Sequence, residues 1–376
     1  MATKIPLTRP YFDSEELQEV KGVLNSGWVT SGPKVKELER NISDYLGTKY
    51  AVAVSNCTSA LHLALLSIGI KEGDDVLVAD YTFPATGYAV LYCRANPIFV
   101  DIDPKTYNIN PDLIEEKITD KTKAIIPVHT FGQPSDMDKI MKIANKHNLK
   151  VIEDAACALG AKYKNKFAGT IGDIGCFSLH ARKGITTGEG GIAVTNKRDL
   201  AQKMRSLSVF GMNQPAWERE KETTPSVSEF MSLGYNYKMS DITAAIGIAQ
   251  LRKLNKIIKR KKTLAKYWDK KLKNLPSIRP PYVSKNVTHV YQSYVALLSG
   301  RIERNKTIET LLTKGVQTQI GTYASHVQSA YNSKDKCPNS LDIFKTALAL
   351  PIYYTLNKKD IDKAARTIKK VLEGKA

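Results

Sequence analysis

The sequence predicts an α/β fold with one large, mostly parallel sheet and a smaller C-terminal α/β domain. Short apolar runs rich in β-branched residues recur up to residue 195, and segments with helical spacing separate the earlier ones. This alternation is typical of a parallel sheet covered on both faces. The composition changes after residue 195, and a chain of 376 residues is long enough for a second domain.

Seven short apolar segments are the predicted strands of the large sheet. They cover residues 51–54, 76–79, 97–102, 124–128, 150–153, 174–178 and 191–195. Helical spacing is clearest at 58–69, 84–94 and 136–147. Ligands of such sheets bind at the carboxyl ends of the strands, beside helix N-termini. The site is therefore expected at that edge.

The second part of the chain begins with a polar segment, 213–229, which the composition predicts to be a surface loop. A long helix is predicted from Ser240, a good capping residue, to about residue 272. Beyond it, residues 293–298 read as a strand, and 304–314 and 359–373 as helices.

We therefore expect a large domain at 1–255, with its N-terminal segment packing on the small domain, and a small domain at 256–376.

The net charge of +19 leaves two interpretations, a nucleic-acid-binding regulator or a soluble protein with a lysine-rich surface. Much of the excess lies at 253–273 and 358–375, where the pattern resembles solvated helix faces. The sequence contains neither zinc-finger spacing nor a basic run interleaved with aromatic residues, so nucleic acid is not an expected partner.

The five cysteines form no CxxC pair, which argues against a disulfide framework or a metal site. The first twenty residues lack the apolar core of a signal peptide, and no apolar run approaches 18 residues. We expect no membrane partner and a cytoplasmic location.

The segment GDIGCFSLHARKGITTGEGG carries the most specific chemical signal in the chain. A predicted strand ends at residue 178, and Lys183 follows in a polar loop before a glycine-rich turn. A lysine that forms a Schiff base must be partly desolvated, so that its amine is neutral often enough to attack a carbonyl. Taken alone, Lys183 could equally be a surface lysine in a hairpin loop.

The chain resembles the DegT/DnrJ/EryC1/StrS family of sugar aminotransferases from about residue 6 to 350. The resemblance rests on an ordered series of motifs: GPKVKELE, YAVAVSNCTSALHLAL, YTFPAT, FVDIDPKTYNI, AIIPVHTFGQPSDMD, VIEDAACALGA, GDIGCFSLHARKGITTGEGG and LGYNYKMSDITAAIGIAQL. It implies fold type I, the aspartate aminotransferase-like fold, with pyridoxal 5′-phosphate (PLP) as cofactor. It also implies that Lys183 forms the Schiff base with that cofactor.

Further cofactor contacts follow from the resemblance. Asp154 would lie against the pyridine nitrogen and keep it protonated, although an Asp after a strand is also a common helix cap. Thr58 and Ser59 would bind the phosphate at a helix N-terminus, a place that plain helix capping also explains. Cys57 stands where the family often has glycine.

The family's ring-stacking aromatic matches Phe83, which in isolation would more often be a core residue. Ser178 matches a phosphate contact. Cys157 matches a position that touches the cofactor ring, usually with a longer polar residue. Asn236 matches an asparagine that reaches the cofactor phosphate of a neighbouring subunit, which implies a homodimer with active sites at the subunit interface. Tyr235 is expected on the same surface.

The resulting hypothesis is an aminotransferase that moves an amino group from L-glutamate to a keto-deoxysugar attached to a nucleoside diphosphate. His326 and Arg205 are further candidates for substrate binding. A cyclitol aminotransferase of the same fold remains open. A sugar dehydratase of the fold is disfavoured, because that branch has histidine where this chain has Lys183.

Overall fold

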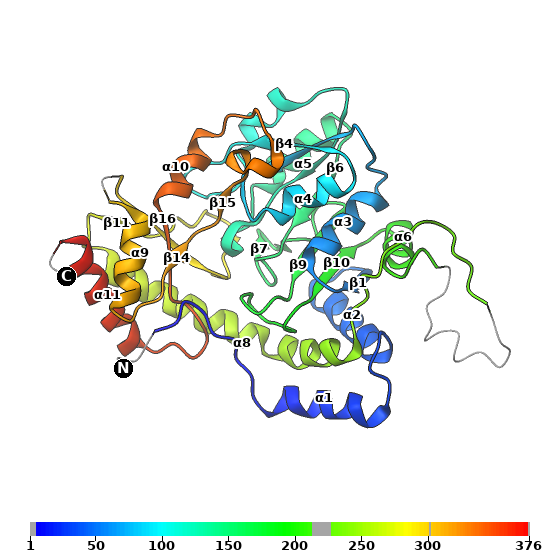
Figure 1. Ribbon diagram of the computed structural model, residues 1–376, viewed down its shortest axis with the longest axis horizontal. Helices are drawn as coiled ribbons and strands as arrows, with labels where there is room; N and C mark the ends of the chain where they lie inside the picture. The colour runs from blue at the N-terminus through cyan, green and yellow to red at the C-terminus, as the bar shows by residue number, and fades with distance from the viewer. Residues whose placement is uncertain (1–4, 213–226, 301, 375–376) are drawn as a thin grey trace.

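The computed structural model describes residues 5–212, 227–300 and 302–374 (Figure 1). The predicted loop at 213–229 lies outside the described residues except for 227–229. The predicted seven-stranded sheet is confirmed, in the order β1-β10-β9-β6-β5-β2-β4. Its strands are β1 (Tyr50–Val54), β2 (Asp75–Ala79), β4 (Asn96–Val100), β5 (Thr122–Ile126), β6 (Lys150–Asp154), β9 (Ile174–Ser178) and β10 (Gly191–Thr195). Among the seven, β10 runs in the direction opposite to the other six, so the sheet is mostly parallel.

Both faces of this sheet are buried, which explains why its strands are apolar throughout rather than alternating. In β1, Val52 and Val54 pack into the cluster that contains α3, whereas Ala51 and Ala53 pack into the cluster that contains α2. Helices α3 (Cys57–Ser67), α4 (Ala85–Tyr92) and α6 (Arg198–Ser208) cover the first face. Helices α2 (Pro33–Leu46), α5 (Met137–Lys146) and α8 (Asp241–Leu272) cover the other.

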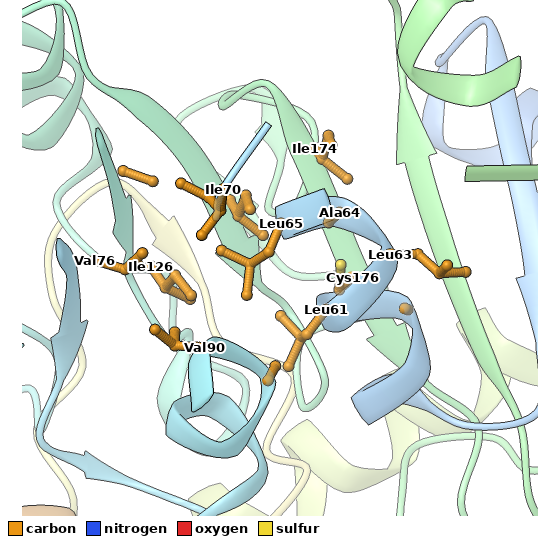
Figure 2. Close-up of a cluster of buried hydrophobic side chains, with 14 of the residues drawn as sticks. Leu61, Leu63, Ala64, Leu65, Ile70, Val76, Val90, Ile126, Ile174 and Cys176 are labelled. Atoms are coloured by element: carbon orange, nitrogen blue, oxygen red, sulfur yellow. The ribbon is translucent and has the colours of Figure 1, made fainter. Parts of the chain in front are cut away.

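Helix α3 is the centre of the first layer. Figure 2 shows Leu61 and Leu65 of α3 pointing toward Val76 and Ile126 of the sheet and Val90 of α4. Each leucine is almost completely buried. Burying a leucine is worth about 1.5–3 kcal/mol, so these contacts hold the N-terminus of α3 firmly over the sheet edge.

The C-terminal part is built on a second sheet, in the order β11-β13-β16-β14, with antiparallel pairing. Its strands are β11 (Ile278–Arg279), β13 (Tyr294–Leu298), β14 (Gln319–Ile320) and β16 (Ala347–Leu350). Helices α9 (Arg304–Thr313) and α11 (Lys358–Leu372) pack on it. Ile5 lies in the same core and its backbone bridges to Val316, so the start of the chain packs on this part.

Helix α8 (Asp241–Leu272) runs through both parts of the molecule, along the lower side of Figure 1. Its first half packs under the large sheet through Ile248 and Leu254, and its second half enters the C-terminal core through Trp268. The proposed division at residue 255 therefore falls inside a continuous helix, and it stays a prediction.

Two short strand pairs also join the parts. β15 (Tyr323–Ala324) pairs with β3 (Tyr81–Thr82), and β12 (Val287–Thr288) pairs with β7 (Lys162–Tyr163). The C-terminal half thereby reaches the chain beside Phe83. Helix α10 (Pro338–Thr346), which the sequence analysis did not predict, follows β15.

Helix α1 (Ser14–Ser26), also not predicted, lies along α8. Lys253 of α8 is buried there and pairs with Asp13 and Glu16, at 2.8 Å for Glu16 Oε1. No helix in the described part of the chain is long and apolar enough to cross a bilayer. All five cysteines are free thiols.

Candidate active site

A cavity of about 550 Å³ opens at the carboxyl edge of the large sheet, where parallel sheets of this type bind ligands. Its walls come from the ends of β6 and β9, the start of α3, and residues of the C-terminal part such as Gln292 and Gln319. Six of the predicted cofactor residues line it: Thr58, Phe83, Asp154, Cys157, Ser178 and Lys183.

Lys183 lies in the loop between β9 and β10, with Nζ 3.2 Å from the Cys157 sulfur. Burial alone would lower the pKa of Lys183, but the neighbouring Cys157, Cys57 and Asp154 outweigh it and raise that pKa above its usual value. The ammonium form is therefore favoured, and Lys183 must give up a proton before it can bond to a carbonyl carbon.

The loop that carries Lys183 is fixed by hydrogen bonds that the sequence analysis did not anticipate. The Lys183 amide donates to the His180 carbonyl at 2.9 Å, and the Gln292 side-chain amide donates to the Arg182 carbonyl at 2.8 Å. The Gln292 carbonyl in turn accepts from Lys261 Nζ of α8 at 3.0 Å. Lys261 is buried, and burial lowers its pKa to about 8. These contacts hold the loop that carries Lys183.

Asp154 is the last residue of β6 and is 4% exposed. Its Oδ2 accepts from the Thr86 hydroxyl at 2.7 Å, and its Oδ1 accepts from the Ala156 amide at 3.0 Å. Thr86, on α4, is a functional residue that the sequence analysis missed, although it closes the YTFPAT motif. The two bonds fix the orientation of a buried carboxylate on the cavity wall.

Glu153, directly before Asp154, fixes the end of β6 through its own hydrogen bonds. It is fully buried and accepts from the amides of Gly169, Ile171 and Gly172 at 2.6–2.7 Å, and from His129 Nε2 at 2.8 Å. A fully buried carboxylate needs such donors to offset its lost hydration.

The tautomer of His129 follows from the hydrogen bond at its other ring nitrogen. Nδ1 accepts from the Ser135 amide at 3.1 Å, so Nε2 carries the proton that it donates to Glu153. Neutral His129 therefore completes the set of donors around Glu153.

The start of α3, where the sequence analysis expects the cofactor phosphate, lies at one end of the cavity. Asn56 caps the helix: its Oδ1 accepts from the Ser59 amide at 2.8 Å and from the Ser59 hydroxyl at 3.1 Å. Ser59 does not line the cavity, because its hydroxyl is turned toward this cap. Thr58 does line it, and the first-turn amides of Cys57 and Thr58 precede the helical hydrogen-bond ladder.

Phe83 follows β3 and is 64% exposed, with its ring centroid 6.2 Å from that of Tyr323. An aromatic ring this open to solvent is not a core residue, and it offers a free face at the cavity wall. Ser178, at the end of β9, accepts from the His180 amide at 3.3 Å. Its hydroxyl hydrogen is still available to a ligand.

Asn236 and Tyr235 do not reach this cavity within one chain. Asn236 is exposed, and its Oδ1 accepts from Lys238 Nζ. Tyr235 stacks on Tyr237, with ring centroids 5.0 Å apart. Exposed apolar side chains surround this segment, among them Phe210, Phe230, Met231 and Leu233.

Arg205 also lies outside the cavity, because its guanidinium is paired with Glu39 at 2.8 Å. His326 is held away by Asp80, whose carboxylate accepts from the His326 amide at 2.6 Å and from its Nδ1 at 2.7 Å. Asp80, His326 and Cys337 bring metal-ligand atom types within 4.8 Å of one another, but two of the three are already bonded to each other.

The residues present fit PLP. The cavity holds an amine at Lys183, a buried carboxylate at Asp154 and a helix N-terminus beside Thr58. The helix N-terminus approaches β10 very closely: a Cβ on Gly191 would lie 2.3 Å from the Asn56 backbone. Backbone amides at a helix N-terminus bind phosphate readily.

Sequence comparison also points to an aminotransferase family. The model of the DegT/DnrJ/EryC1/StrS aminotransferase family matches residues 10–369. The chain is 40% identical to an uncharacterized protein of Methanocaldococcus jannaschii, over 98% of this chain and 97% of that protein. It is 36% identical to the spore coat polysaccharide biosynthesis protein SpsC of Bacillus subtilis, with the same coverage.

Solved structures agree. The aminotransferase TlmJ from Streptoalloteichus hindustanus superposes with a TM-score of 0.92 at 29% identity, over 99% of this chain and 100% of that one. The candidate sugar aminotransferase Spr1654 from Streptococcus pneumoniae, in its PLP form, gives 0.91 at 28% with the same coverage. DesI in the presence of its TDP-sugar product gives 0.90 at 28%, over 100% of this chain and 95% of that one.

The family match spans nearly the whole chain, and the cavity carries the groups that PLP chemistry requires. The chain belongs to the DegT/DnrJ/EryC1/StrS aminotransferase family and is a PLP-dependent sugar aminotransferase.

Proposed function

We propose that the protein transfers the amino group of L-glutamate to a keto-deoxysugar attached to a nucleoside diphosphate, as a step in making amino sugars for polysaccharides. The observation that carries the proposal is the joint placement of Lys183 and Asp154 on the wall of one cavity at the sheet edge. The cavity of about 550 Å³ lies within the range of small-molecule sites and is compatible with this proposal.

In this reaction PLP, when bound, supplies an electrophilic aldehyde and an electron-withdrawing ring. Lys183 would hold it covalently and, when free, would move the proton to and from the substrate carbon. Asp154, fixed by Thr86 and the Ala156 amide, would keep the ring nitrogen protonated. Phe83 would cover one face of the ring, and Thr58 and Ser178 would bind the phosphate, with Ser59 supporting the helix start.

Cys157 contributes less to the ring's electronics than a longer polar residue would, because a thiol is a weak hydrogen-bond donor. Its contact with Lys183 Nζ gives it a second role in the proposal, namely positioning the amine.

We further propose a homodimer in which Asn236 and Tyr235 face the partner's cavity, with Arg205 near the same surface. The exposed apolar side chains beside them support an interface, since contiguous apolar surface of this kind marks a contact site. For His326 we propose a structural role as well: its contact with Asp80 holds the chain after β15 beside β3. Five unpaired cysteines support a reducing cytoplasm as the location.

A panel of UDP-, GDP- and dTDP-linked 3- and 4-keto sugars, each incubated with L-glutamate, tests the proposal. We expect mass spectrometry to detect an amino sugar from at least one nucleotide sugar, together with 2-oxoglutarate. The Lys183→Ala variant should give no product and should lack the absorption band of the lysine-bound cofactor. Amination of a free cyclitol ketone, with every nucleotide sugar inert, would replace this function by the alternative one.

A further inference from the structure

Arg182 places a second cation on the wall of the active-site cavity. It immediately precedes Lys183, lines the cavity and is exposed. Among the described residues that line this cavity, Arg182 and Lys183 are the only arginine and lysine. Because Lys183 binds the cofactor, Arg182 is the cation that remains for a substrate.

The backbone of Arg182 is fixed, whereas its guanidinium has no hydrogen-bond or ion-pair partner among the residues that the structure describes. Its amide donates to His180 Nδ1 at 3.2 Å, and its carbonyl accepts from Gln292 at 2.8 Å. In the part of the chain that the structure describes, its side chain makes no ion pair. Glu189, an acid on the same wall, lies 3.6 Å from His180 Nε2 instead. A charged head on an anchored backbone, facing a cavity and without an anionic partner, is suited to bind an anion.

We propose that Arg182 binds the oxyanion that each substrate carries away from its reacting carbon. This inference rests on the proposed function, because glutamate has a side-chain carboxylate and a nucleotide sugar has a diphosphate. A guanidinium presents a planar fork of donors that matches both groups, which an ammonium does not. The two substrates occupy the cavity in turn, so one cation can serve both.

Three holoenzyme variants test Arg182. Arg182→Gln removes the charge, and Arg182→Lys keeps it without the fork. Arg198→Gln removes an exposed charge from the first turn of α6, outside the cavity, and is the matched control. Circular dichroism and the cofactor content of each variant confirm that folding and loading are intact.

One arm of the experiment measures the donor half-reaction alone, by the change in cofactor absorbance, with L-glutamate and with L-alanine. If the carboxylate is the anion, Arg182→Gln lowers kcat/KM for glutamate by about 10- to 100-fold, as expected for losing a charge-assisted hydrogen bond. Alanine, which lacks that carboxylate, reacts as with the wild type. Arg182→Lys lies between the two, and Arg198→Gln is unchanged.

The other arm measures equilibrium binding of UDP, GDP and dTDP by calorimetry. If the diphosphate is the anion, Arg182→Gln weakens binding of the nucleotide that the wild type prefers by a similar factor. Losses in both arms support the inference, whereas a loss in one arm alone overturns the view that one cation serves both substrates and restricts Arg182 to that anion. Unchanged values in both arms overturn it. A wild-type protein that neither reacts with glutamate nor binds a nucleotide would instead refute the proposed function.

Discussion

Replacing Glu153 with glutamine tests the hydrogen-bond network beneath Asp154. Each carboxylate oxygen of Glu153 receives two donors: Oε1 faces the amides of Ile171 and Gly172, and Oε2 faces the Gly169 amide and His129 Nε2. A glutamine keeps one acceptor oxygen and replaces the other by an NH₂ group. Whichever way it turns, two buried donors then face a donor.

The expected loss of unfolding free energy follows from the number of unpaired donors. An unpaired buried donor costs about 1–3 kcal/mol, so two cost about 2–6 kcal/mol, a large part of a typical unfolding free energy of about 5–15 kcal/mol. Urea unfolding followed by circular dichroism, at a fixed concentration of added PLP, measures the difference between Glu153→Gln and the wild type. The concentration must be fixed because a ligand of the native state adds its own stabilisation.

Glu116→Gln is the matched control, because Glu116 is exposed and should change stability by no more than about 0.5 kcal/mol. A loss below about 1 kcal/mol for Glu153→Gln would refute the view that four donors hold a charged Glu153.

Three further predictions concern other parts of the chain. Burial raises the pKa of Glu16, but hydrogen bonds led by the one from Lys253 hold that pKa below its usual value, so the stabilisation from this pairing is present above about pH 4.5 and is lost as the pH falls further. Lys253→Met should therefore lower the unfolding free energy at pH 7 by about 3–5 kcal/mol, as measured by thermal unfolding. An unchanged melting temperature would contradict the pairing. Burial lowers the pKa of His62 from 6.5 to about 4, so stability should decline as pH falls from about 6.5 to 4, and NMR of the imidazole should titrate near 4 rather than above 6. Gly191→Ala should weaken PLP binding at least about tenfold in equilibrium dialysis, since its Cβ would meet the Asn56 backbone at 2.3 Å; unaltered affinity would show that the start of α3 is not needed for the cofactor.

The large sheet could be predicted from the sequence because most residues of its strands are buried, so that each strand contains a short apolar run. The first helices were not predicted, although Val35, Leu38, Ile42 and Leu46 recur at helical spacing; what the sequence does not show is the surface against which these helices pack. The apolar face of α2 meets α8, about 200 residues later in the chain, and α1 is held to α8 partly by the buried ion pair of Lys253. Neither partner is visible from local periodicity.

The candidate site also combines residues that stand in local sequence motifs with residues that only the folded chain brings near. Lys183, Asp154 and Thr58 lie in local motifs at strand ends and helix starts, and their expected roles follow from the resemblance of these motifs to the family, because each residue read alone has a plain structural explanation. Gln292 and Lys261 act on the Lys183 loop from distant segments, through a side-chain amide and a carbonyl that no local pattern marks. Their roles emerge only when the chain is folded.

Because α8 is one continuous helix, the enzyme cannot readily be divided into two separately folding fragments. A cut near residue 255 would leave Leu254 and Ile257 on opposite fragments, although both belong to one core beneath the large sheet. The excised C-terminal fragment would also lose Ile5, which completes its own core. Neither fragment could then hide its apolar surface, so we expect both to aggregate when expressed separately. Exchange of C-terminal halves between relatives would succeed only with a junction upstream of α8, and with the opening residues and β3 matched to the incoming half.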